Sequence, residues 1–231
     1  MLGAAVALAA VLVLVLVLVS SGGGGGGSGS TTTESGGSRG GAVAGRAEAL
    51  ALMAGIPQNG TALGSPRAPV TVYEFADLQC PFCRDVALET LPDLIRKHVR
   101  TGQVRLVYQD LAFLGPDSVK AAHAAAAAAQ QDRLWQFAHL MYANQGEENS
   151  GWVTDALLDR IWNAIPGLDV QRAKRAAAAG AGTADLALAR RLARSYGIDG
   201  TPAFVAGRTG GTLEPVDPAD LNDQIDSLVS G

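Results

Sequence analysis

The feature that most constrains the fold is the order of segments around the chain's two cysteines. Residues 70–75 (VTVYEF) are rich in β-branched and aromatic side chains, which predicts a central strand covered on both faces. The cysteines follow as Cys80-Pro81-Phe82-Cys83, and over residues 86–99 apolar side chains recur mostly every three or four positions. That spacing predicts an amphipathic helix that begins at the cysteines. A strand, a tight loop and a helix therefore come in succession.

The segments after this helix predict a mixed α/β fold with a helical insertion. Gly102 ends the helix, and residues 104–108 (VRLVY) supply a second strand, which the βαβ crossover makes parallel to the first. Residues 203–206 (AFVA) predict a further short strand, and residues 218–229 a closing amphipathic helix. Between them lie candidate helices separated by glycine or proline, at residues 121–129, 134–141, 153–164, 170–179 and 184–195.

The N-terminal residues differ in composition from the rest of the chain. Residues 1–19 form an uncharged apolar run close to the ~20 residues that a membrane-spanning helix needs. The run has no positively charged start and no clear small-x-small cleavage site, which favours an uncleaved anchor over a cleaved signal. Residues 20–41 are almost entirely glycine, serine and threonine, a composition typical of a flexible linker.

We therefore expect four parts along the chain. They are a transmembrane anchor or uncleaved signal (1–19), a Gly/Ser-rich linker (20–41), an N-terminal helix and loop (42–63), and an α/β domain (64–231) with its helical insertion at about 113–197. The net charge of −4 comes from intermixed acids and bases without a basic tract. This pattern argues against nucleic acid as a partner.

The cysteine pair itself has three possible uses: a metal site, a structural disulfide or a redox couple. Both cysteines lie within one tetrapeptide, and closing so short a loop removes little entropy from the unfolded chain. Structural zinc normally takes four ligands, whereas His98, His123 and His139 show no ligand spacing with the cysteines. A metal site within one chain is therefore disfavoured, although one shared between two chains remains open.

The position of the pair favours redox chemistry. At the start of a helix, unpaired backbone N–H groups and the helix dipole stabilise a thiolate, which makes Cys80 the candidate nucleophile. Cys83, nearly one turn later and facing inward, is the candidate resolving thiol that attacks a mixed disulfide. Pro81 suits the first helical turn because its missing N–H group is not needed there.

Three parts of the sequence together resemble the DsbA-like thiol:disulfide oxidoreductases of the thioredoxin superfamily. They are residues 73–75 leading to Cys80-Pro81-Phe82-Cys83, the long helical insertion, and Gly200-Thr201-Pro202. The resemblance covers roughly residues 64–229. It implies a thioredoxin-like α/β fold, with the helical insertion between the βαβ part and a C-terminal ββα part, and it implies an enzyme that exchanges disulfides.

The resemblance also implies roles for Glu74, Thr201 and Pro202. The family has a buried acid six positions before the first cysteine, here Glu74, which would relay protons; from the residues alone a partly solvated strand position is equally compatible. The family places a cis-proline opposite the cysteines, here Pro202, although base rates alone favour trans. The backbone of the preceding Thr201 would pair with an extended substrate peptide.

One departure from the family leaves the direction of the reaction open. Strongly oxidising members carry a histidine just before the second cysteine, where this chain has Phe82. We list Phe82 with Thr201 and Pro202 as candidate substrate-binding residues, and Cys80, Cys83 and Glu74 as candidate catalytic residues. Disulfide formation is the preferred hypothesis, with a reductase or isomerase, or a non-catalytic binding or redox-sensing module, as alternatives.

The N-terminal segment and the resemblance together imply a setting for this chemistry. With residues 1–19 as a single-pass anchor, the domain would lie on the extracytoplasmic side of the cell membrane, and it would be secreted if that segment is cleaved. There it would form disulfides in unfolded or partly folded secreted proteins with free thiols. A membrane redox partner, in the family a quinone-linked oxidase, would reoxidise the couple. We expect no cofactor beyond the redox-active cysteine pair, and no bound metal.

Overall fold

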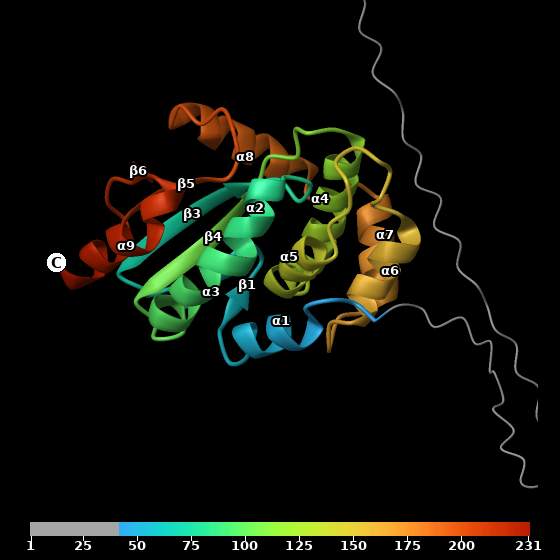
Figure 1. Ribbon diagram of the computed structural model, residues 1–231, viewed down its shortest axis with the longest axis horizontal. Helices are drawn as coiled ribbons and strands as arrows, with labels where there is room; N and C mark the ends of the chain where they lie inside the picture. Colours follow the sequence, from blue (N-terminus) through green and yellow to red (C-terminus); the bar gives the residue numbers. More distant parts are fainter. Residues whose placement is uncertain (1–41) are drawn as a thin grey trace, which may run out of the picture. The chain divides into compact units, whose positions relative to one another are not determined.

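A computed structural model of the chain describes residues 42–231, which fold around one six-stranded sheet with the strand order β1-β2-β4-β3-β5-β6 (Figure 1). The central strands β3 and β4 run parallel, as the βαβ prediction requires, and the remaining pairs are antiparallel. The strands are β1 (Gln58–Asn59), β2 (Ala62–Leu63), β3 (Val70–Ala76), β4 (Val104–Asp110), β5 (Ala203–Arg208) and β6 (Glu214–Val216). The predicted anchor (1–19) and linker (20–41) lie outside the described residues.

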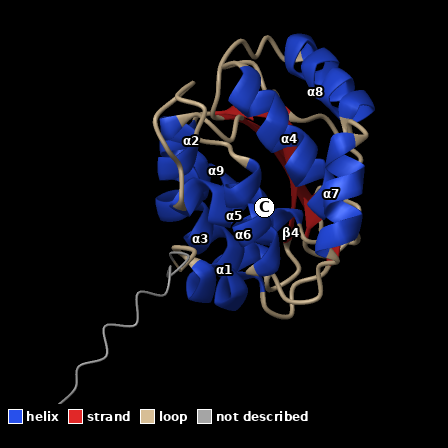
Figure 2. Cartoon of the chain, turned by 90° about the vertical axis from the view of Figure 1, so that its right-hand side faces the viewer, coloured by secondary structure: helices blue, strands red, loops and turns tan. Residues whose placement is uncertain are grey.

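Helices cover both sides of this sheet (Figure 2). They are α1 (Arg46–Met53), α2 (Pro81–Asp85), α3 (Leu91–Leu94), α4 (Pro116–Ala129), α5 (Leu134–Ala143), α6 (Asp155–Asn163), α7 (Val170–Ala178), α8 (Thr183–Ser195) and α9 (Leu221–Ser230), with π-helical η1 (Val86–Thr90) and η2 (Ile95–Val99) and the 3-10 turn η3 (Pro218–Asp220). Helices α4 to α8 stand between β4 and β5, which confirms the α/β fold with a helical insertion. Among the described residues no helix is both long and apolar enough to cross a bilayer.

The alternation of side chains along β3 decides which groups face the reactive helix. The side chains of Val72 and Ala76 point into the larger hydrophobic core. Side chains of α5 and of the segment after the cysteines belong to the same core. Phe75 points to the opposite face, where it packs with Val205 and Ala189 of α8. Glu74 has the parity of Val72, so its carboxyl lies on the face covered by the cysteine-bearing helix.

The helix after the cysteines is not the regular α-helix that the spacing predicts. It begins where expected, but its hydrogen bonding widens to π-helical turns at η1 and η2, where the Leu91 N–H donates to the Val86 carbonyl. Pro92 explains the first widening, because proline has no N–H group and its ring conflicts with the carbonyl four residues earlier. The wider turn accommodates the ring without ending the helix.

Candidate active site

Cys80 is the N-cap residue of α2, directly after the loop that leaves β3. Its sulfur accepts a hydrogen bond from the Cys83 backbone N–H at 3.3 Å, and Pro81 occupies the first turn. The Arg84 N–H closes the turn on the Cys80 carbonyl at 3.1 Å. The predicted strand, loop and helix thus place a thiol where free helical N–H groups converge.

The two cysteines lie in different electrostatic environments. A hydrogen bond from the Cys83 thiol lowers the pKa of Cys80 to about 6, with a smaller contribution from the Cys83 N–H and against the opposing effect of burial. Cys83 is completely buried, and burial raises its own pKa far above that of a free thiol. At neutral pH, Cys80 is therefore the thiolate and Cys83 the thiol, which is the division of roles that a nucleophile and a resolving cysteine need.

Glu74 lies behind the cysteines, in register with Tyr108 of β4. Its side chain is buried, and neither carboxyl oxygen has a hydrogen-bond partner among the described residues. Burial raises the pKa of Glu74 to about 8. The buried interpretation of Glu74 is confirmed over the solvated one, and the carboxyl is protonated at neutral pH, so it can donate a proton.

The chain segment before β5 returns to the cysteines. The Thr201–Pro202 peptide bond is cis, as expected from the resemblance. The Cys80 sulfur lies 3.5 Å from the Thr201 carbonyl oxygen, to which it donates in its thiol form, so residues more than a hundred positions apart in sequence meet at the reactive sulfur. Thr201 and Pro202 are half-buried, which leaves this backbone beside the thiol partly open to a partner. Their substrate-binding role stays a prediction.

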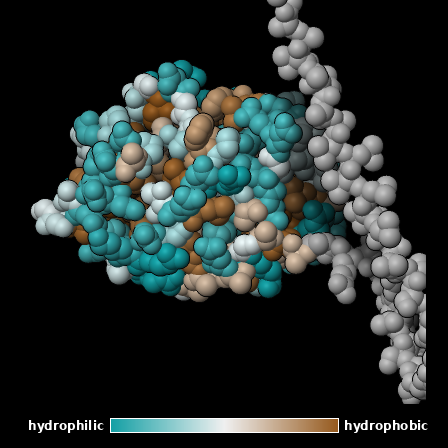
Figure 3. Space-filling model, in the orientation of Figure 1, coloured by the Kyte–Doolittle hydropathy of each residue, from teal (hydrophilic) through white to brown (hydrophobic). Residues whose placement is uncertain are grey.

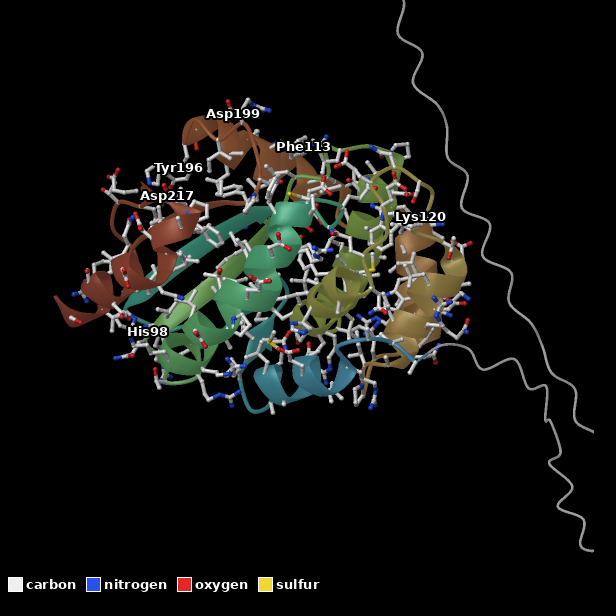
Figure 4. The ribbon with its side chains drawn as sticks, viewed as in Figure 1. His98, Phe113, Lys120, Tyr196, Asp199 and Asp217 are labelled. Carbon is white, nitrogen blue, oxygen red and sulfur yellow. The ribbon has the colours of Figure 1, made fainter. Side chains whose placement is uncertain are left out.

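Two exposed phenylalanines lie on elements next to the reactive sulfur. Phe82 of α2 is 70% exposed, and Phe113, in the loop after β4, is 48% exposed. Hydrophobic residues gather around the start of α2 in the space-filling view (Figure 3), and Phe113 lies at that end of the molecule, opposite His98 (Figure 4). Phe113 is not among the site residues predicted from the sequence; its place directly after a strand parallel to β3 was the available signal, since parallel strands end at one edge of the sheet.

Asp77 anchors the loop between β3 and α2, residues 77–80, which we call the cysteine loop. Asp77 is likewise not among the site residues predicted from the sequence. The carboxylate is fully buried and receives hydrogen bonds from the Gln79 N–H (2.9 Å) and the Ser118 hydroxyl (2.7 Å) on one oxygen. Its other oxygen accepts from the N–H groups of Phe113 (2.9 Å) and Leu114 (3.1 Å). One carboxylate therefore fixes the loop of Cys80 to the loop that presents Phe113.

The helical insertion holds the cysteine loop from the other side. The Gln145 side-chain amide donates to the carbonyl oxygens of Leu78 (3.0 Å) and Cys80 (3.2 Å). The Gln79 amide donates to the Ser118 hydroxyl at 2.9 Å, and its oxygen accepts from the Asn149 N–H at 2.8 Å. These contacts give the insertion a structural role in positioning Cys80.

Other charged and ligand-type residues stay apart from the sulfurs. Arg84 forms an exposed ion pair with Asp85, so its charge is directed to that carboxylate. His98 is paired with Asp226, and His123 lies 2.7 Å from the Ala181 carbonyl oxygen. Within residues 42–231 no group of three or more His, Cys, Asp or Glu side chains has the arrangement of a metal site.

This chain is similar to proteins of the thiol-redox class. The family model described as thioredoxin matches residues 57–227. A probable disulfide bond formation protein D of Bacillus cereus is 36% identical over 116 residues, which cover 49% of this chain and 54% of that protein. The chain thus aligns with about half the length of this relative.

Solved structures agree in fold. The crystal structure of oxidised BdbD from Bacillus subtilis has a TM-score of 0.65 at 22% identity, covering 76% of this chain and 98% of that chain. A thioredoxin-like oxidoreductase from Silicibacter pomeroyi has a TM-score of 0.58 at 32% identity, covering 80% of this chain and 98% of that chain.

Proposed function

Since the chain belongs to the thioredoxin family, we propose that it is a DsbA-like thiol:disulfide oxidoreductase that forms disulfides in other proteins through Cys80 and Cys83. The observation that carries this proposal is the position of Cys80 as helix N-cap, with a pKa of about 6, beside a buried Cys83. A stabilised Cys80 thiolate favours the reduced couple, so the disulfide form takes electrons readily from other thiols.

Oxidation of a substrate proceeds in two exchanges. A substrate thiolate attacks Cys80 Sγ of the Cys80–Cys83 disulfide; a substrate–Cys80 bond forms, and Cys83 leaves as a thiolate. Because Cys83 is buried, it takes a proton, which we assign to the Glu74 carboxyl. A second substrate thiolate then attacks the substrate sulfur of the mixed disulfide and expels the Cys80 thiolate. Two electrons pass from the substrate to the couple, and the substrate gains a disulfide.

The surface around the sulfur suits an extended, unfolded chain. Phe82 and Phe113 are exposed and apolar, and the half-buried backbone at Thr201 offers hydrogen bonds that do not depend on the partner's sequence. We propose unfolded or partly folded secreted proteins with free thiols as substrates, and a membrane redox partner that reoxidises the couple. In this proposal residues 1–19 anchor the domain on the extracytoplasmic side and residues 20–41 are its tether.

Phe82 favours the alternative in which the couple acts as a reductase or isomerase. Its side chain is 70% exposed and carries no donor for the Cys80 thiolate, so the side chains that lower the pKa of Cys80 are those of Cys83 and, to a smaller extent, Thr201. Weaker stabilisation of the reduced form would make the couple a reductase or isomerase. The reduction potential of the couple separates these alternatives.

The proposed function is tested with reduced, unfolded protein that needs disulfides to become active. The full chain in its oxidised form should accelerate the recovery of activity, and Cys80→Ser should abolish the acceleration while circular dichroism stays native. Cys83→Ser should also lose the acceleration, because it cannot form the Cys80–Cys83 disulfide that takes electrons from the substrate. Equal acceleration by wild type and Cys80→Ser would refute the function.

A further inference from the structure

A small cavity behind the cysteines brings Glu74 together with a histidine that the proposed chemistry does not use. The cavity measures about 20 Å³ and is lined by Glu74 of β3, Tyr108 of β4, and His139 and Tyr142 of α5. Its remaining wall is made by side chains of α1, the segment after the cysteines and α5, such as Leu52 and Leu91. A space of this size admits about one water molecule.

Two of the lining groups have unused hydrogen-bonding capacity. Both oxygens of Glu74 and Nε2 of His139 are buried without a partner among the described residues. Buried polar atoms are nearly always hydrogen-bonded in folded proteins, to protein or to ordered water. A water in this cavity has the polar neighbours that such a water needs.

The hydroxyls of Tyr108 and Tyr142 do not form a proton route from the cavity to solvent. The Tyr108 and Tyr142 hydroxyls lie 3.3 Å apart, and the Tyr142 hydroxyl donates to the Asp77 carbonyl oxygen at 3.4 Å. Burial raises the pKa of both tyrosines, so both stay neutral. Because a backbone carbonyl cannot pass a proton onward, this chain of hydrogen bonds ends inside the protein.

His139 lies on the side of the cavity nearer to the surface. The imidazole packs under the start of α1, next to Gly45. A Cβ atom added to Gly45 would lie 3.6 Å from Nε2 of His139. Gly45 itself is only half-buried. Glu48, exposed in the first turn of α1, acts on His139 with its charge. Figure 1 shows α1 beside one end of α5. His139 therefore stands between the cavity and solvent.

The imidazole is suited to carry a proton in either direction. Burial lowers the pKa of His139, which keeps the ring neutral at pH 7, with one nitrogen accepting and the other donating. The titratable groups that face this region are Glu48 from α1, Cys83 from α2, Glu74 from β3, Tyr108 from β4, and His139 and Tyr142 from α5, with Asp110 acting on Tyr108.

We propose that one water in this cavity joins Glu74 to His139, and that His139 passes protons between Glu74 and the surface at the start of α1. This inference rests on the proposed function, in which Glu74 protonates the leaving Cys83 thiolate. The Glu74 carboxylate then recovers its proton through the water from the imidazole, and the imidazole takes one from solvent at the Glu48 side. His139 does not touch the sulfurs and acts only through Glu74.

The test is single-turnover oxidation of the reduced Cys80–Cys83 couple in the full chain by excess oxidised glutathione, followed by the loss of thiolate absorbance across neutral pH. Glu74 is protonated in the reduced chain at neutral pH, so it must pass its proton to His139 before it can accept the proton of Cys83. His139→Ala should slow the reaction by about tenfold, because general acid–base groups contribute at least that much. Free imidazole should restore the rate of His139→Ala, since it fits the space left by the side chain. His123→Ala, which removes a histidine outside the cavity, should react like wild type.

A second variant keeps the proposal testable if His139→Ala folds poorly. His139→Gln retains hydrogen bonding without a titrating group, and it should be slow and not restored by imidazole. A wild-type rate and pH profile in both variants, or a slow His139→Ala that imidazole does not restore, would overturn the proposal. Because oxidised glutathione reacts directly with the cysteine couple, this result is independent of whether the chain oxidises protein substrates, which the wild-type activity assay decides.

Discussion

Cys80 and Cys83 have the same side chain, but their different positions in the fold give the two thiols different pKa values. Cys80 caps a helix and receives hydrogen bonds from Cys83, whereas Cys83 is enclosed by the core. The pKa of Cys80 falls to about 6 and that of Cys83 rises for these reasons. The attacking sulfur is therefore charged at neutral pH, and the leaving sulfur needs a proton donor close by.

The first prediction concerns the source of the low Cys80 pKa. Cys83→Ala removes the thiol donor, which is the largest contribution, but keeps the backbone N–H. We expect the midpoint of alkylation of Cys80 by iodoacetamide to rise from near pH 6 by about one unit or more. Arg84→Ala, which removes a charge paired with Asp85, serves as the control and should leave the midpoint unchanged.

The second prediction concerns Glu74 as proton donor. Glu74→Gln preserves the shape of the side chain but cannot release a proton, so disulfide exchange at neutral pH should slow by roughly tenfold to a hundredfold. Stopped-flow measurement of exchange with a small disulfide or thiol gives the rate. Glu89→Gln, a change at an exposed glutamate of η1, should leave the rate unchanged. An unaltered rate in Glu74→Gln would remove Glu74 from the mechanism.

At the scale of elements, the loop between β3 and α2 is held by contacts from distant parts of the chain. Asp77 joins it to the loop after β4 and to α4, and Gln145 joins it to the end of α5. The helical insertion is thus part of the scaffold that positions Cys80. A buried carboxylate that receives several hydrogen bonds is costly to replace.

The third prediction follows from that network. Asp77→Asn places an amide N–H₂ where the carboxylate accepts from backbone N–H groups, so unfolding in urea should show a loss of about 2–4 kcal/mol. The reactive loop should also loosen, and the Cys80 midpoint should shift. Asp93→Asn, at an exposed ion pair with Arg96, should change stability by less than about 1 kcal/mol. A stability loss no larger than that of this control would show that the network does not hold the loop.

Much of this architecture is predictable from local pattern. The strand, cysteine loop and helix, the parallel βαβ unit and the helices of the insertion follow from periodicity and from glycine and proline breaks, which act over a few residues. The Asp77 network and the cavity of Glu74 and His139 depend on which distant groups meet. These contacts join residues that are far apart in the sequence, and no local spacing predicts them, so they are seen only in the folded chain.

For the molecule as a whole, burying Glu74 lowers the free energy of unfolding at neutral pH. The same burial keeps its carboxyl protonated, so that it can act as a proton donor. Its pKa rises from 4.5 to about 8 on folding, so the folded state holds a proton that the unfolded state releases. Between these values stability therefore falls as pH rises, because ionisation is favoured only in the unfolded chain. Costly buried ionisable groups of this kind are typical of functional sites.

The fourth prediction is that Glu74→Gln stabilises the protein. At pH 7 the gain should be on the order of 3 kcal/mol, and it should vanish below about pH 4.5, where both states are protonated in wild type. Urea unfolding of the reduced proteins at several pH values measures the difference. A gain that does not depend on pH would mean that packing, not ionisation, separates the two proteins.

The reduction potential of the Cys80–Cys83 couple in the full chain, measured by equilibration with glutathione, decides whether the protein forms disulfides. The stabilised Cys80 thiolate predicts an oxidising couple, with a potential of roughly −180 mV or higher. A value near roughly −270 mV, where thioredoxin lies, would contradict disulfide formation as the function and assign the same residues to a reductase.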